Sequence, residues 1–382
     1  MKVYLDNAAT TPLDPEVIEA MLPVMRNDFG NPSSSHAFGR KVKAHIETSR
    51  KTIAKLLNVS PAEIIFTSGG TEADNTAIRS SVELMGVKHI ITSPIEHHAV
   101  LHTVEELAHS GAIQMHLVQL LADGHVDLQH LEALLKSHQN VLVSLMHGNN
   151  EVGNLLDIEK VSQLCRLNNA LFHCDTVQTM AHYAFDFKAL DLDFAVGAAH
   201  KFNGPKGVGF LYYNKRNKIR PLITGGAQER ELRAGTENVY GIVGLAKAME
   251  IAYRDLTKKQ DHIKGLKDYF IEQVKAEFPS IQFNGDTAGR SLYTVLSLAF
   301  PPEVSSDILL FSFDLQGIAV SGGSACSSGS NTGSHVIRGI GKHLDCAPVR
   351  FSFGKHNTKA EVDYVLGFIR SLFEQSKKKA SL

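Results

Sequence analysis

The chain has 382 residues, of which 43% are hydrophobic and 21% charged, a balance typical of folded proteins and not of disordered ones. Because this length exceeds what one typical hydrophobic core supports, we expect two domains. Lys plus Arg (39) nearly equal Asp plus Glu (40), no stretch is long enough to span a bilayer and no signal-like segment opens the chain, so we expect a cytoplasmic protein that acts on small molecules and binds neither nucleic acid nor membrane.

Short apolar runs alternate with amphipathic stretches over roughly the first 250 residues, after a helix start at Asp14-Pro15. The predicted strands of this part cover residues 64–67, 89–92, 113–118, 140–146, 170–175 and 192–196. The predicted helices cover residues 71–84, 98–108, 127–135 and 158–167. This order predicts a doubly wound, mostly parallel α/β sheet, in which ligands gather at the carboxyl ends of the strands.

The remainder of the chain has a different pattern. A long helical pattern runs from about Tyr240 to about Phe278, and strand candidates follow at 294–299 and 349–353. We therefore expect a large α/β domain and a smaller α+β domain. The predicted boundaries are 15–255 for the large domain, with 1–14 and 256–382 forming the small one.

Two polar residues follow apolar strands in positions that suit one cofactor. Lys201 comes shortly after the run 192–196, and Asp175 ends the run 170–175. A partly buried lysine at the rim of a sheet can form a Schiff base, and a carboxylate can pair with a ring nitrogen. Pyridoxal phosphate (PLP) needs both partners, so the pair predicts PLP. The alternatives are a surface lysine and an aspartate that caps a helix.

A glycine-rich turn supplies a candidate site for the cofactor phosphate. Gly70 and Thr71 lie between the strand 64–67 and the helix 71–84, where backbone N–H groups, a hydroxyl and the helix dipole can meet an anion. By itself such a turn more often only connects a strand to a helix and binds no anion.

The four cysteines are irregularly spaced, which argues against a disulfide framework and against zinc ligation. Cys165 and Cys174 lie in apolar runs and are expected to be buried, whereas the role of Cys346 is undecided. Cys326 differs, because every neighbour from 321 to 334 has a small side chain. We expect this segment to move and to carry a nucleophile between a cleft and an acceptor.

These features occur together in one known family. The matching stretches are 4–11, 30–36, 67–75, 96–100, 147–153, 233–238, 324–326, 349–352 and the segments around Asp175 and Lys201. The chain resembles cysteine desulfurases of the NifS type, within the class V aminotransferases and the fold-type I PLP enzymes. The resemblance implies a homodimer that takes sulfur from L-cysteine, leaves L-alanine and passes a persulfide to a sulfur acceptor in iron–sulfur cluster assembly or tRNA thiolation.

The resemblance also implies roles for individual residues. The catalytic residues would be Lys201, Cys326 and His97. The cofactor would be held by Gly70, Thr71, His97, Asn150, Asp175, Gln178, His200, Lys201 and Thr236. Thr236 would reach the phosphate of the partner subunit, and the substrate would contact Asn31, Asn150 and Arg350.

Several alternatives remain open for these residues. Arg350 lies inside an apolar strand-like segment, where it needs an anion; we assign it the substrate carboxylate, with a structural ion pair as the alternative. Asn150 could form a turn and Thr236 could cap a helix. His98 and His102 share a helical face, but we expect a solvated face and no metal site, because no third ligand follows at useful spacing.

Two features depart from the family pattern. Ala198 stands where relatives carry a hydroxyl that contacts the phosphate, and a lost hydrogen bond to a charged group costs about 1.5–3 kcal/mol. The chain also ends soon after Phe373, without the longer extension of relatives that dock an iron–sulfur scaffold. The competing functions are a selenocysteine lyase and a non-catalytic sulfur carrier that binds PLP weakly.

Overall fold

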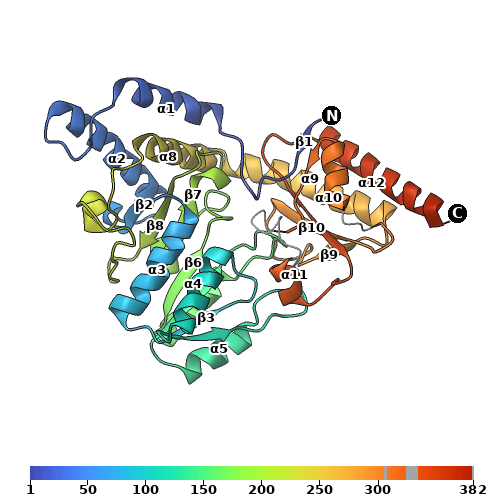
Figure 1. Ribbon diagram of the computed structural model, residues 1–382, viewed down its shortest axis with the longest axis horizontal. Coiled ribbons are helices and arrows are strands. Elements are labelled where there is room, and N and C mark those ends of the chain that lie inside the picture. The colour runs from blue at the N-terminus through green and yellow to red at the C-terminus, as the bar shows by residue number, and fades with distance from the viewer. Residues whose placement is uncertain (305–307, 324–333, 381–382) are drawn as a thin grey trace.

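A computed structural model describes residues 1–304, 308–323 and 334–380 and contains a central sheet of seven strands (Figure 1). In spatial order its strands are β2 (Ile64–Thr67), β8 (Gly209–Tyr213), β7 (Phe194–Ala198), β6 (Leu171–Asp175), β5 (Val141–Met146), β3 (His89–Thr92) and β4 (Gln114–Leu117). All neighbours are parallel except β8, which runs antiparallel to both β2 and β7. The predicted mostly parallel α/β sheet is confirmed.

Helices cover both faces of this sheet (Figure 1). They are α1 (Pro15–Asn27), α2 (Ala37–Leu56), α3 (Gly70–Met85), α4 (His98–His109), α5 (Leu128–Ser137), α6 (Ile158–Leu167), α7 (Phe187–Leu190) and α8 (Val239–Arg254). Successive strand residues point to opposite faces, so Ile90 packs with α3 and α4 whereas Ile91 packs with α5 and α6. Asp14 caps α1 as predicted, because its Oδ1 accepts a hydrogen bond of 2.8 Å from the backbone N–H of Glu16.

A second apolar core is built from the chain's two ends (Figure 1). Its strands are β12 (Ala347–Ser352), β10 (Val295–Phe300) and β9 (Gln282–Asn284), an antiparallel sheet, and β1 (Val3–Tyr4), which pairs in parallel with β11 (Ile318–Ala319). Its helices are α9 (Leu256–Glu277), α10 (Leu309–Leu315), α11 (His335–Ile340) and α12 (Lys359–Ala380). Val3 of β1 and the adjacent Leu5 belong to this core, whereas Thr11 and Asp14 bond to His200 and Asn203 after β7; the domain boundaries stay a prediction.

The structure corrects two details. The single helix expected from about Tyr240 to Phe278 is wrong, because the chain forms α8 and α9 with a break at Asp255. The N–H of Asp255 bonds to the carbonyl of Ile251 and closes α8, and a one-residue break is too short to disturb an apolar repeat. Strand β8 was also missed. In the described part of the chain, no helix combines the length and the apolar character needed to cross a bilayer.

Candidate active site

A cavity of about 240 Å³ opens at the carboxyl ends of β5, β6 and β7. The residues that line it are Ala8, Ala9, Gly70, Thr71, Asp74, His97, Met146, Gly148, Asn150, Asp175, Val177, Gln178, Ala198, His200, Lys201 and Arg350. Most residues predicted for the site are therefore together, although they are far apart in the sequence. The location is the one at which open α/β sheets bind ligands.

Lys201 enters the cavity from a short turn after β7. The strand ends at Ala198 and a 3₁₀ turn, η2 (Ala199–Lys201), redirects the chain at once. The Nζ atom of Lys201 donates hydrogen bonds to the carbonyls of Ala8 (2.7 Å) and Ala9 (2.9 Å). Gln178 Nε2 donates to the same Ala8 carbonyl at 3.0 Å, so the amine and the amide lie within one hydrogen-bonded group.

Asp175 ends β6 and is 5% exposed. Its Oδ1 accepts a hydrogen bond of 2.9 Å from the backbone N–H of Val177, but residues 177–179 form a turn and not a helix, so Asp175 does not cap a helix. Burial raises the pKa of Asp175, while the Val177 N–H and the positive charge of Lys201 act in the opposite direction. The carboxylate and the amine thus share one cavity and interact electrostatically, which is the arrangement that the sequence predicted.

His97 is the N-cap of α4 and lines the same cavity. Its Nδ1 accepts a hydrogen bond of 3.1 Å from the backbone N–H of Ala99, which fixes the orientation of the ring. Burial and the nearby charge of Lys201 lower the pKa of His97 to about 4. The ring is therefore neutral near pH 7, a form that can stack on an aromatic ring and accept a proton.

The amino end of α3 opens on the cavity, where the sequence predicts a site for an anion. The first backbone N–H groups of any helix have no partner within the helix, and Gly70 and Thr71 present them to the cavity. A Cβ atom at Gly70 would lie 2.6 Å from Cγ2 of Val177, so only glycine fits there. Ala198 and His200 line the same cavity, and His200 Nδ1 is 3.2 Å from Thr10 Oγ1.

Arg350 lies on β12 and is only 2% exposed. It donates to the carbonyl of Asn150 and to Oδ1 of Asp6, both at 2.8 Å. The ion pair considered from the sequence therefore exists. Nevertheless, Arg350 lines the cavity, and its buried Nε has no hydrogen-bond partner among the described residues. The guanidinium thus lies where an anionic ligand in the cavity can meet its positive charge, although the Nε atom itself is buried.

Three predicted residues lie elsewhere. Asn31 precedes α2, outside the described lining of the cavity, and its Oδ1 accepts from the backbone N–H of Ser33 at 2.9 Å. Thr236 lies just before α8 and is likewise not in contact with this cavity in its own chain. Cys326 falls outside the described residues. Of the paired histidines, His102 is exposed as expected, but His98 is half-buried and bonds to His335 at 3.2 Å.

Two buried carboxyl groups near the cavity were not predicted. Asp74, on α3, is 1% exposed, and burial and the charges of Asp175 and Glu96 raise its pKa well above the usual value. Glu96 is equally buried, and burial raises its pKa to about 8 although Ser93 donates to its Oε1 at 2.7 Å. Both acids lie in stretches that match the family, but nothing in those stretches shows that they are buried side by side with Asp175.

We expect Glu96→Gln to weaken the pH dependence of stability. The pKa of Glu96 is 4.5 when exposed and about 8 when folded, so the folded protein holds a proton that the unfolded chain has lost. The wild-type free energy of unfolding should fall as pH rises through this window, by on the order of 4 kcal/mol between about pH 5 and about pH 8. Urea unfolding at both pH values measures this difference in the free energy of unfolding. The exposed Glu374→Gln is the matched control, and identical pH slopes in all three proteins would contradict the assignment.

Comparisons with known proteins agree with this geometry. Residues 3–365 match the family model described as aminotransferase class-V. A cysteine desulfurase IscS from Dictyoglomus turgidum is 42% identical over 379 residues, which cover 98% of this chain and 95% of that protein.

Two solved structures are also similar over nearly the whole chain. A NifS-like protein is 38% identical with a TM-score of 0.90, covering 98% of this chain and all of that one. SspA in complex with cysteine is 31% identical with a TM-score of 0.77, covering 94% of this chain and all of that one. With the amine, the acid and the anion site in one cavity, the chain belongs to the class V aminotransferase family.

Proposed function

We propose that this protein is a PLP-dependent cysteine desulfurase, which converts L-cysteine to L-alanine and leaves a persulfide on Cys326. The observation that carries the proposal is the convergence of Lys201, Asp175 and the amino end of α3 on one cavity. The similarity to proteins named cysteine desulfurase, and to a structure solved with cysteine, supports the reaction and the substrate.

The residues that line the cavity fit PLP. Gly70 and Thr71 would bind its phosphate, Asp175 its ring nitrogen, and Lys201 its aldehyde, with Gln178 and His97 beside the ring. The close approach of Gly70 to Val177 leaves room for backbone N–H groups and none for a side chain. When bound, PLP supplies an electron sink for bond changes at the substrate Cα.

The protein's own groups would handle protons and charge. The Nζ atom of Lys201 donates hydrogen bonds to two backbone carbonyls, which hold the amine in the cavity. Once the substrate amine has taken the place of Lys201 at the cofactor, the amine of Lys201 can move a proton to and from the substrate Cα. His97 is neutral and can accept the proton of the substrate thiol. Arg350, whose guanidinium lines the cavity, would hold the substrate carboxylate, with Asn150 beside it.

Sulfur transfer would take place at Cys326. Its thiolate attacks the substrate sulfur, a sulfur–sulfur bond forms, and the Cβ–S bond breaks with its electron pair going to the carbon skeleton that becomes alanine. The other cysteines suit this role less well. Cys165 and Cys174 are buried, and burial raises the pKa of both thiols far above the usual value, which keeps them unreactive.

We expect Cys326→Ala to retain the cofactor but to release sulfide from cysteine at least about 100-fold more slowly. Mass spectrometry after brief exposure to cysteine should find one added sulfur on the wild-type peptide that contains Cys326 and none in the variant. Cys346→Ala, which changes a half-exposed thiol, is the matched control. It should keep both the rate of sulfide release and the added sulfur on the peptide that contains Cys326. Sulfur on another peptide would overturn the nucleophile, and selenide release without sulfide release would favour a selenocysteine lyase.

A homodimer follows from the same proposal. Thr236 does not reach the cavity of its own chain, as expected of a residue that contacts the phosphate of the partner subunit. The persulfide would pass to an acceptor protein in iron–sulfur cluster assembly or tRNA thiolation. Sedimentation of the holoprotein tests the dimer.

A further inference from the structure

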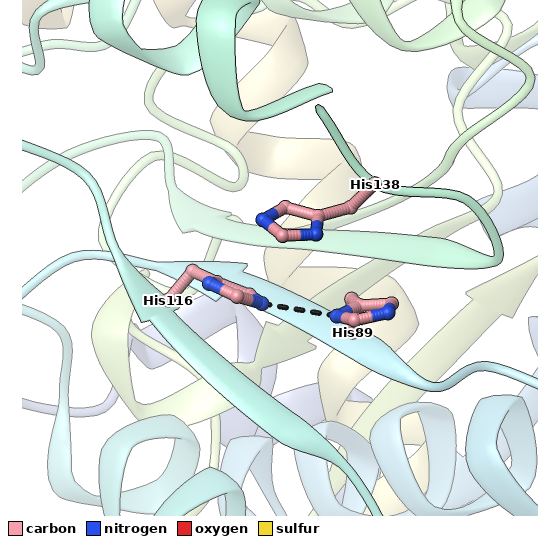
Figure 2. A group of neighbouring side chains, drawn as sticks. All are labelled: His89, His116 and His138. Carbon is pink, nitrogen blue, oxygen red and sulfur yellow. Dashed lines mark hydrogen bonds between the residues drawn. The ribbon is translucent and has the colours of Figure 1, made fainter. Parts of the chain in front are cut away.

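Three histidines from separate elements meet at one edge of the central sheet, and none of them lines the cavity (Figure 2). His89 begins β3, His116 lies on β4, and His138 directly follows α5. One ring nitrogen from each lies within 4.8 Å of one from each of the others. No other group in the described part of the chain brings three potential ligands this close.

The fold holds these side chains together. Strand β3 pairs with β4 so that His116 lies opposite Ile91, which puts His89 and His116 on the same face of the sheet in diagonal positions. Asn140 adopts a left-handed backbone with φ of 55°, and its carbonyl accepts hydrogen bonds from the N–H groups of Lys88 and His89. This turn, between α5 and β5, sets His138 above the same face.

The rings already interact. His89 Nδ1 and His116 Nε2 are hydrogen bonded at 3.0 Å, shown by the dashed line in Figure 2. The ring of His138 stacks on both, with centroid separations of 4.6 Å to His89 and 4.1 Å to His116. A ring-to-ring hydrogen bond requires a neutral imidazole with a free lone pair, and neutral imidazole is the form that binds metals.

The geometry points to a three-histidine site for a Zn²⁺-type divalent cation, formed by His89, His116 and His138 and completed by water. Zn–N bonds of about 2.0–2.1 Å in a tetrahedron place ligand nitrogens about 3.3 Å apart, close to the 3.0 Å between His89 Nδ1 and His116 Nε2, and all three nitrogens lie within 4.8 Å of one another. Because the ring of His138 is stacked on the other two, binding a cation requires the rings to rotate about their side-chain bonds until the three lone pairs converge. All three residues are partly exposed, so a cation can enter from solvent.

The position of the site indicates what it would do. Strand β4 is at the edge of the sheet and has only β3 as a neighbour in that sheet. A cation held by β3, β4 and the turn after α5 would fasten this edge to the rest of the sheet. It would therefore stabilise the folded protein without taking part in the chemistry at Lys201.

Equilibrium dialysis of the PLP-loaded protein against Zn²⁺ tests the proposal. We expect wild type to bind one more Zn²⁺ per chain than His116→Asn, whose affinity at this site should fall at least about 100-fold. Saturating Zn²⁺ should raise the melting temperature of wild type by about 2–6 °C and leave that of the variant unchanged. Desulfurase activity measured without added metal should be equal in both.

Matched variants identify which histidines bind. His109→Asn removes an exposed histidine at the end of α4, and His98→Asn disrupts the separate pair with His335; both should keep the Zn²⁺ that His116→Asn loses. His138→Asn changes a residue outside regular structure and should reproduce the loss even if His116→Asn folds poorly. Equal Zn²⁺ binding by all variants, or loss only in His98→Asn, would overturn the proposal.

Discussion

Replacing Lys201 with alanine is expected to lower the rate of sulfide release from cysteine by at least about 10⁴-fold. The change removes both the amine that would hold PLP and the group that moves the proton at Cα, and no other lysine lines the cavity among the described residues. Borohydride reduction followed by peptide mass spectrometry should label the peptide that contains Lys201 in wild type only.

The control for this change is Lys206→Ala, which removes an exposed lysine from the same loop and should keep nearly full activity. A small primary amine added to Lys201→Ala should restore part of the rate, because it can replace a missing proton carrier but cannot repair a damaged fold. Activity within about tenfold of wild type in Lys201→Ala would contradict the proposed function.

Asp175→Asn is expected to reduce kcat by about 10²–10³-fold while preserving the structure. Asparagine has the same shape, and its Oδ1 can still accept the hydrogen bond from the Val177 N–H. What is lost is the negative charge that would favour a protonated ring nitrogen and hence electron withdrawal from the substrate. Steady-state kinetics and the absorption spectrum of the bound cofactor measure both consequences.

Asp74→Asn, in the same cavity, tests whether the effect of Asp175→Asn comes from the lost negative charge or from the change of side chain. Burial and the charges of Asp175 and Glu96 raise the pKa of Asp74 well above its usual value, which favours the neutral carboxyl that asparagine imitates. We expect a rate within about tenfold of wild type. If Asp74→Asn lowers kcat as much as Asp175→Asn does, the charge that matters has been assigned to the wrong residue.

Much of the fold and the centre of the site could be predicted from the sequence because they depend on local patterns. The short apolar run 170–175 is typical of a buried strand, and a polar residue at its end lies where the strand leaves the sheet. Because parallel strands end at the same edge, Asp175 and Lys201 could be placed near each other without a structure.

Other features depend on contacts between distant parts of the chain. The sequence alone left two partners open for Arg350, and the fold shows that Asp6, 344 residues away, is already one of them. The run 209–213 has the aromatic and apolar residues of a strand, but only the fold shows that it lies between β2 and β7 and runs antiparallel to both.

The sequence by itself determined the mostly parallel α/β sheet and the positions of Asp175 and Lys201 at or just after strand ends, because strand periodicity and the residue types at strand ends are local properties. Only the tertiary structure decided the environment of each group: the buried acids Asp74 and Glu96 beside Asp175, the Asp6–Arg350 pair and the cluster of His89, His116 and His138. Burial and contacts between residues that are distant in the sequence set pKa values and bring ligands together. Local sequence patterns do not specify either of them.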